Sequence, residues 1–206
     1  SKEEHPRTII KRAPWPLRFV VMRFLHTSDL HLGRRFHGMD LTCAQRAFLD
    51  QLYATARAEK VDAILLAGDV YDRAIPSLDA VRLFSHCLEQ LAELGIPTVI
   101  ISGNHDSAHR LGVGAKLLSR AGVHLITHPD SCADPLLLDG QDGTVAVYGI
   151  PYLEPSMVHT GLKAPEATHQ AVLSWPPAQA APAAWSWPTP SSPARHRPRP
   201  PAASGT

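Results

Sequence analysis

Three short strings of this sequence hold residue types that could do chemistry: DLH at 29–31, GDVYD at 68–72 and GNHD at 103–106. Their carboxylates, imidazoles and amide oxygen are ligand types that bind divalent metal ions. A pair of such ions, roughly 3.5–4 Å apart, lowers the pKa of a bound water and stabilises charge on a phosphoryl group. The strings therefore predict a metal-dependent site that hydrolyses a phosphate ester.

Residue type and position suggest a role for each polar side chain of these strings. Asp69, in the middle string, is predicted to bridge two metal ions. Asp29 and His31 are two residues apart on a chain that leaves a strand, so they point the same way and suit the first ion. Asn104 offers a neutral oxygen to the second ion. Its neighbour His105 is predicted to be a general acid or a donor to a phosphoryl oxygen.

Residues within and beside the strings are expected to support the site. Asp106 is predicted to assist catalysis by holding His105 in its working tautomer. Gly68 and Gly103 are expected to allow the tight turns that bring the ligands together. Four basic residues are candidates for contacts with phosphate or DNA, with a solvated basic loop as the alternative: Arg34, Arg35, His109 and Arg110.

Each string follows an apolar, β-prone run, so each is expected at the end of a strand. Continuous apolar runs predict buried strands, and apolar residues at helical spacing predict helices between them. The expected strands are 23–26, 63–67, 98–101, 123–126, 136–138 and 144–148, and the expected helices are 42–59, 78–94 and 113–120. This alternation predicts an α/β layered domain with parallel central strands, whose carboxyl ends carry the ligand site.

The chain divides into three segments. Residues 1–21 lack periodicity and are expected to form a loose leader, whereas residues 22–173 carry the strand and helix pattern. Residues 174–206 hold nine prolines and no acidic residue, and proline at this density neither continues a helix nor pairs in a sheet. We expect this last segment to be a disordered tail.

Composition limits the location and the partners of the protein. The net charge of +1 over 206 residues gives no general signal for nucleic acid, so a DNA-binding hypothesis depends on the site. The distant cysteines Cys43, Cys87 and Cys132 have no zinc-site spacing and are typical of a reduced intracellular protein. Neither a membrane-spanning run nor a signal peptide is evident. We expect a cytoplasmic protein that does not bind membranes.

Longer stretches around the three strings resemble one family. They are similar to the SbcD-type nuclease subunits, which are calcineurin-like metallophosphoesterases. The stretches are MRFLHTSDLHLGRRFH at 22–37, LLAGDVYDRAIPS at 65–77, ISGNHDSAHRL at 101–111 and VAVYGIPYLEP at 145–155. The resemblance extends from about residue 22 to about residue 173.

The resemblance implies a calcineurin-like α/β sandwich, of which this chain would form the first half, and two Mn²⁺ ions. It places the family's metal ligands on Asp29, His31, Asp69 and Asn104 and its catalytic histidine on His105. The implied activity is that of a 3′–5′ exonuclease and endonuclease, which processes double-stranded DNA ends and hairpins in replication, recombination and repair. The implied partner is an SMC-type ATPase like SbcC.

Two downstream strings of the family are absent, namely a histidine that ends an apolar strand and Gly-His-x-His. His159 and His169 lack this strand and glycine context, and His196 lies in the proline-rich segment. With three histidine ligands missing, we expect weak binding of the second metal ion and impaired catalysis. A frameshift between about residues 173 and 186 is our hypothesis for the loss, because residues 186–193 read in a shifted frame can encode an apolar string with a histidine.

Three functions remain open from the sequence. The first is an SbcD-type nuclease, the second is an inactive fragment without a partner, and the third is a small-molecule phosphodiesterase or phosphatase that needs one metal ion. Protein phosphatases of this scheme read GNHE and GDxVDRG. Asp106 in place of glutamate, and the lack of a glycine after Arg73, favour the nuclease.

Overall fold

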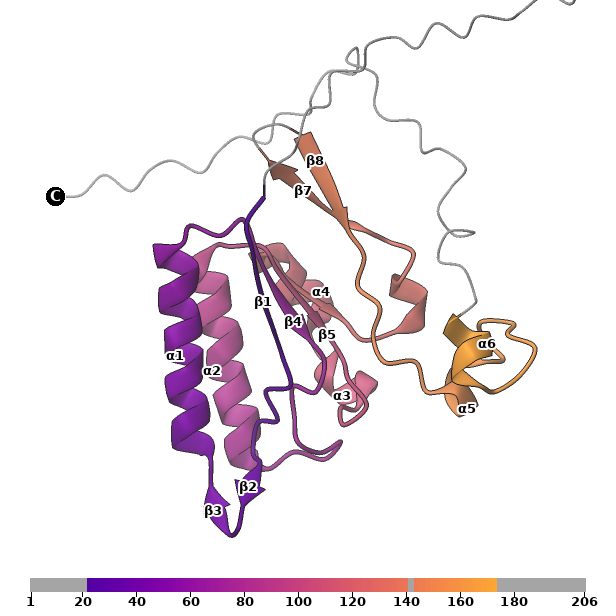
Figure 1. Ribbon diagram of the computed structural model, residues 1–206, viewed down its shortest axis with the longest axis horizontal. Coiled ribbons are helices and arrows are strands. Elements are labelled where there is room, and N and C mark those ends of the chain that lie inside the picture. The colour runs from indigo at the N-terminus through magenta and orange to yellow at the C-terminus, as the bar shows by residue number, and fades with distance from the viewer. Residues whose placement is uncertain (1–21, 141–142, 174–206) are drawn as a thin grey trace, which may run out of the picture.

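A four-stranded sheet forms the centre of the structure, a computed structural model that describes residues 22–140 and 143–173 (Figure 1). All four strands are parallel and their order is β1-β4-β5-β6. Their bounds are β1 Phe24–Ser28, β4 Ala63–Ala67, β5 Thr98–Ile101 and β6 Val123–Ile126. The predicted parallel sheet is confirmed, and β4, β5 and β6 begin and end at the residues that their apolar runs indicated.

The register of this sheet places the three candidate strings side by side. Ser28 pairs with Ala67, Ala67 with Ile101, and Ile101 with Ile126. The carboxyl ends of the four strands therefore lie in one row. The DLH and GDVYD strings begin at the residue after their strands, and GNHD begins two residues after β5.

Two long helices, α1 (Thr42–Ala58) and α2 (Leu78–Leu94), cover one face of the sheet (Figure 1). The hydroxyl of Ser77 accepts a hydrogen bond from the backbone N–H of Ala80 at 3.3 Å, which caps the start of α2. The helix ends at Gly95, whose φ of 66° is a left-handed conformation that glycine adopts without strain. These two signals account for the agreement between α2 and its expected bounds.

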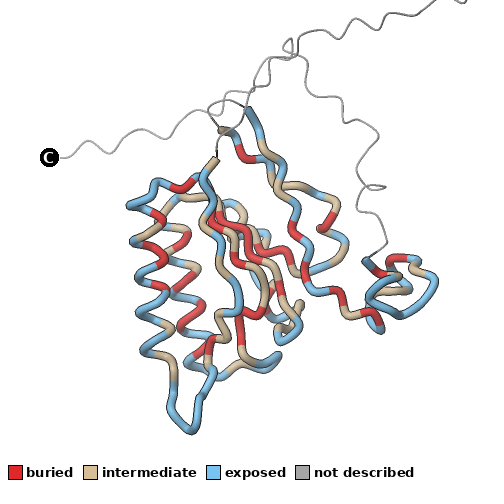
Figure 2. The backbone as a smooth tube through the Cα atoms, in the orientation of Figure 1, coloured by how far each residue is buried: buried red, intermediate tan, exposed pale blue. Residues whose placement is uncertain are grey.

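The main core lies between these helices and the sheet (Figure 2). Ile64 and Ile100 on the central strands are fully buried, and Leu49 and Leu52 meet them from α1. Burial of each such side chain contributes roughly 1.5–3 kcal/mol to stability. Phe48 has the helical spacing expected of a core residue but is 45% exposed, because Leu49 occupies the core side of that turn.

Shorter elements complete the described chain. They are β2 Arg35–Phe36, β3 Met39–Asp40, α3 Ala108–Leu111, α4 Ala115–Leu118, the 3-10 helices η1 Ser119–Ala121 and η2 Pro129–Ser131, β7 Leu136–Gly140, β8 Gly143–Val147, α5 Pro155–Val158 and α6 His169–Leu173. The pairs β2–β3 and β7–β8 are antiparallel hairpins. The helix expected at 113–120 is found as α4, which begins after Gly114 with its left-handed φ of 77° and passes directly into the 3-10 helix η1.

Two of the predicted segments lie outside the described residues. These are the leader at 1–21 and the tail at 174–206, which includes His196 and most of the region of the hypothetical frameshift. Among the helices of the described residues, none combines the length and the apolar character needed to cross a membrane. The α/β class is confirmed for the part that the structure describes.

Candidate metal centre

The DLH loop leaves β1 in an unusual backbone conformation. Asp29 and His31 have φ values of 55° and 43°, in the left-handed region that costs most residues free energy. The neighbouring loop holds this conformation through backbone hydrogen bonds. The N–H of Asp29 donates to the carbonyl of Gly68 at 3.2 Å, and that of His31 donates to the carbonyl of Asp69 at 2.9 Å. The DLH and GDVYD loops thus form one unit.

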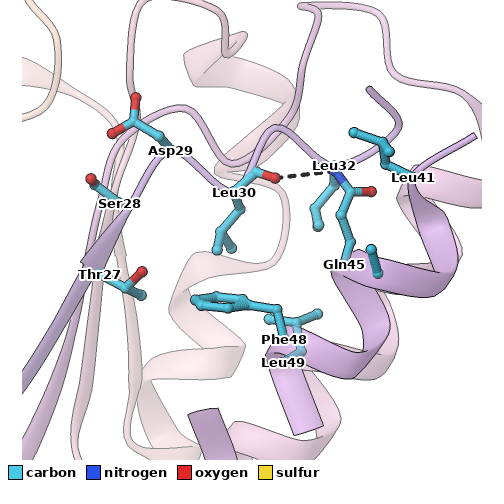
Figure 3. A pocket seen from close by; sticks show the side chains of 10 residues that line it. Thr27, Ser28, Asp29, Leu30, Leu32, Leu41, Gln45, Phe48 and Leu49 are labelled. Carbon is cyan, nitrogen blue, oxygen red and sulfur yellow. Dashed lines mark hydrogen bonds between the residues drawn. The ribbon is translucent and has the colours of Figure 1, made fainter. Parts of the chain in front are cut away.

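Gln45 on α1 contacts the same loop from the helix side (Figure 3). Its amide nitrogen donates to the carbonyls of Leu30 at 3.2 Å and His31 at 2.6 Å. Its amide oxygen accepts from the N–H of Gly33 at 3.2 Å. Below this contact, Leu30, Phe48 and other apolar residues line a cleft of about 340 Å³ that reaches Asp29. Gln45 was not among the sequence-based candidates, because a glutamine in an amphipathic helix gives no local signal.

The GDVYD and GNHD loops approach each other closely around Asp69. Gly68 and Asp69 have φ values of 79° and 46°, and Asp69 is only 8% exposed. The Oδ1 atom of Asp69 accepts a hydrogen bond from the N–H of His105 at 2.9 Å. A Cβ atom on Gly103 would collide with the carboxylate and backbone nitrogen of Asp69. The lack of a side chain at Gly103 therefore allows the GDVYD and GNHD loops to approach each other this closely.

Three side chains with ligand atoms meet where these loops join. His31, Asp69 and His105 each offer one nitrogen or oxygen atom, and these atoms lie within 4.8 Å of one another. His31 Nε2 is 3.9 Å from Asp69 Oδ2 and 3.8 Å from Asp29 Oδ1. The rings of His31 and His105 meet edge to face with centroids 4.8 Å apart. The structure thus brings Asp29, His31 and Asp69 together and places His105 in the same cluster.

Asp72, which the sequence analysis gave no role, contacts both histidines. Its carboxylate Oδ1 lies 3.3 Å from Nδ1 of His31, a buried nitrogen that makes no hydrogen bond within the described residues. Its backbone carbonyl accepts from Nδ1 of His105 at 2.8 Å. These contacts favour the proton on Nδ1 and leave Nε2 of each ring free. The carbonyl contact also raises the pKa of His105, with further support from nearby carboxylates.

Asp106 contacts backbone N–H groups of two loops. Its Oδ2 atom accepts from the N–H groups of Val70 at 3.0 Å and Gly103 at 2.9 Å, and its Oδ1 atom accepts from that of Tyr71 at 2.8 Å. The carboxylate is thus bound to backbone donors, and the Asp72 carbonyl holds the tautomer of His105. Burial raises the pKa of Asp106, although the three N–H donors oppose this shift. Asp106 fastens the GNHD loop to the GDVYD loop.

The other predicted site residues are all exposed. Asn104 is exposed in the GNHD loop beside His105. Arg34 and Arg35 are exposed at the start of the β2–β3 hairpin, and Arg35 donates to the carbonyl of Gly38 at 3.0 Å. Arg110 donates to the carbonyl of Ala74 at 3.0 Å, and the His109 ring lies 6.1 Å from that of His128. Contacts of these residues with phosphate or DNA stay a prediction.

The donor set of the cluster fits a divalent metal ion. Imidazole nitrogens and carboxylate oxygens are ligands for first-row metals, and carboxylate and amide oxygens suit Mn²⁺. Nε2 of His31 is the unprotonated nitrogen when Nδ1 faces Asp72, which is the form that binds a metal. Asp69 is buried between the loops, where a cation would offset the cost of burying its charge. These residues are therefore of the types, and lie at the spacing, expected of a divalent metal site.

Comparison with known proteins identifies the family. Residues 22–180 match the family model described as calcineurin-like phosphoesterase. The chain belongs to this family. The match confirms the fold family and the phosphoesterase class predicted from the three strings, and divalent metals are the cofactors of such phosphoesterases.

Several curated relatives of this phosphoesterase are named as the SbcD component of the nuclease SbcCD. The chain is 34% identical to that of Staphylococcus saprophyticus over 132 residues, 40% to that of Bacillus subtilis over 109 residues and 35% to that of Escherichia coli K12 over 141 residues. In the same order, these matches cover 64%, 52% and 68% of this chain and 34%, 28% and 35% of the respective relatives. The chain thus spans about a third of the length of these relatives, and its predicted likeness to SbcD is confirmed.

Proposed function

We propose that this phosphoesterase is the metal-binding part of an SbcD-type nuclease that hydrolyses phosphodiester bonds of DNA with Mn²⁺. The observation that supports this most directly is the meeting of His31, Asp69 and His105, whose ligand atoms lie within 4.8 Å of one another. The relatives named as part of the nuclease SbcCD supply the substrate class. Hydrolysis of a phosphodiester needs both a nucleophile and a proton donor, and the cluster has residues suited to each task.

The ligands of two metal ions would come from the ends of three strands. Asp29 and His31 would hold the first ion, Asn104 would contribute to the second, and Asp69 would be shared by both. Bound metal supplies a water of lowered pKa and neutralises charge on the phosphoryl oxygens. The described residues give the second ion fewer ligands than the first. We therefore expect one ion to bind more tightly than the other and turnover to be low.

His105 is the proposed proton donor. Its Nδ1 atom donates to the carbonyl of Asp72 at 2.8 Å, which orients the ring and leaves Nε2 for the substrate. In its protonated form this ring can deliver a proton from Nε2 to the leaving oxygen of the ester. The carboxylate of Asp69 also accepts a hydrogen bond from the backbone N–H of His105, which holds this residue in position.

The proposed substrate is a double-stranded DNA end or hairpin, and the proposed partner is an SMC-type ATPase like SbcC. Arg34 and Arg35 are exposed on the hairpin that follows the DLH loop, where they can meet phosphates next to the hydrolysed bond. The names of the relatives describe one component of a nuclease that has more than one subunit. Three free cysteines fit a reducing compartment, and we propose the cytoplasm.

The test is hydrolysis by the full chain with Mn²⁺, measured on linear duplex DNA and on bis-p-nitrophenyl phosphate. We expect release of nucleotides from DNA ends, loss of activity in His105→Ala and little change in His86→Ala, an exposed histidine on α2. Hydrolysis of the small ester alone would favour a small-molecule phosphodiesterase. Activity that persists in His105→Ala would refute the proposed site, and no activity on either substrate would favour an inactive fragment.

A further inference from the structure

One side chain outside the ligand cluster makes three hydrogen bonds to the DLH loop. The amide of Gln45 donates to the carbonyls of Leu30 and His31, at 3.2 Å and 2.6 Å, and accepts from the N–H of Gly33 at 3.2 Å. Figure 3 shows Gln45 reaching from α1 toward the backbone of Leu30. Gln45 therefore binds the backbone of the proposed ligand His31 and the backbone on both sides of it.

This network also fixes which way the amide of Gln45 points. With the nitrogen toward Leu30 and His31, both of its hydrogens have acceptors, and the oxygen has a donor in Gly33. The opposite orientation would place the oxygen against two carbonyls and the nitrogen against an N–H group. The amide thus has one favourable orientation. In this orientation it holds the backbone of Leu30, His31 and Gly33 in place.

The loop needs such a support because its backbone is strained. Asp29 and His31 lie in the left-handed region, with φ values of 55° and 43°, and Gly33, which tolerates such values, has a φ of 86°. Aspartate and histidine tolerate this conformation better than most residues do, but they still favour others. Strained conformations persist where surrounding contacts over-determine them. The backbone bonds to the GDVYD loop supply one side of that support, and Gln45 supplies the other.

We infer that Gln45 is a positioning residue of the metal centre, which keeps Asp29 and His31 directed toward Asp69 without itself touching metal or substrate. The inference rests on the proposed metal centre. Gln45 acts on the backbone of the DLH loop, so its effect reaches the ion through the placement of two ligands. Contacts that orient metal ligands typically change affinity roughly 10–100-fold when they are removed.

The variant Gln45→Met tests this inference, because methionine has a similar length and no amide. Its thioether can fill the cleft between Leu30 and Phe48, so packing is retained. The matched control is Gln90→Met on α2, where the one side-chain hydrogen bond of Gln90 among the described residues is to Glu93. The measurements are the Mn²⁺ dissociation constant by calorimetry, amide exchange at Gly33 by NMR and the unfolding midpoint in EDTA.

We expect Gln45→Met to weaken Mn²⁺ binding at least tenfold and to speed amide exchange at Gly33, with the control unchanged. We expect a small shift of the unfolding midpoint in EDTA, because release of backbone strain offsets the lost hydrogen bonds. Equal Mn²⁺ affinities of wild type and Gln45→Met would overturn the inference alone, whereas no Mn²⁺ binding by the wild type would overturn the metal centre as well. If Gln45→Met does not fold, Gln45→Glu keeps the acceptor for Gly33 and loses both donors, and unchanged affinity there also overturns the inference.

Discussion

Removal of the Asp106 carboxylate should destabilise the junction of two loops. In the folded protein this carboxylate accepts hydrogen bonds from three backbone N–H groups, those of Val70, Tyr71 and Gly103, at 2.8–3.0 Å. The variant Asp106→Ala leaves all three donors without their acceptor. The variant Asp106→Asn keeps the oxygen that serves Val70 and Gly103 when its amide nitrogen faces Tyr71.

The expected magnitudes follow from the number of bonds lost. A hydrogen bond to a charged acceptor contributes about 1.5–3 kcal/mol net. Asp106→Asn loses one such bond and should lower the free energy of unfolding by about 2 kcal/mol. Asp106→Ala loses three, but the effects of one shared acceptor do not add and water can reach this partly exposed site, so we expect about 4 kcal/mol. The control variant Asp50→Ala, which changes an exposed aspartate on α1, should alter the free energy of unfolding by less than about 0.5 kcal/mol.

Urea unfolding in EDTA, followed by far-UV circular dichroism, measures these free energies without a contribution from metal. NMR titration of His105 in the same variants measures whether Asp106 acts on that ring. We expect stability to fall in the order Asp50→Ala, Asp106→Asn, Asp106→Ala, with only a small decrease in the pKa of His105, because the Asp72 carbonyl has the largest effect on that pKa and Asp106 the smallest. Normal stability of Asp106→Ala together with a shifted pKa of His105 would refute our reasoning and restore the role that the sequence suggested.

Three further predictions concern other parts of the molecule. Asp72→Asn removes the charge opposite His31 Nδ1 and should weaken Mn²⁺ binding roughly tenfold by calorimetry; an unchanged constant would contradict this. Burial raises the pKa of Cys87 to about 11, so a thiol reagent in mildly alkaline buffer should modify the exposed Cys43 quickly and Cys87 only after unfolding, as mass spectrometry can show. Burial lowers the pKa of His124 below its usual 6.5, so protons favour the unfolded chain and stability should fall as pH decreases through this range. Urea unfolding should show a smaller decrease in His124→Gln, and equal pH dependence would argue against this cause.

The inner strands of the central sheet could be predicted from the sequence because they are buried on both faces. Ala63–Ala67 is a continuous apolar run and Thr98–Ile101 is apolar except for Thr98, which is typical of buried parallel strands. Parallel strands then place the residues that follow them at one edge, so His31 and Asp69 could be expected to meet. The resemblance to a known family agreed with this prediction, because the three strings follow one another in the same order in that family.

The supporting contacts of the site could not be predicted in the same way. Asp72 and Asp106 act on partners that local spacing does not reveal, because their contacts depend on how two loops more than thirty residues apart pack together. Gln45 lies in a helix where a polar residue usually faces solvent. The β2–β3 hairpin has two residues per strand, too few for a periodic pattern, and its turn is formed by His37 and Gly38 with positive φ values.

The most direct test of the metal centre is an anomalous difference map from crystals of the full chain soaked in MnCl₂. We predict a peak within bonding distance of His31 Nε2 and the Asp69 carboxylate, next to Asp29, with any second peak weaker and on the side of Asn104. A map without a peak among these residues, from crystals that show Mn²⁺ bound elsewhere, would contradict the account.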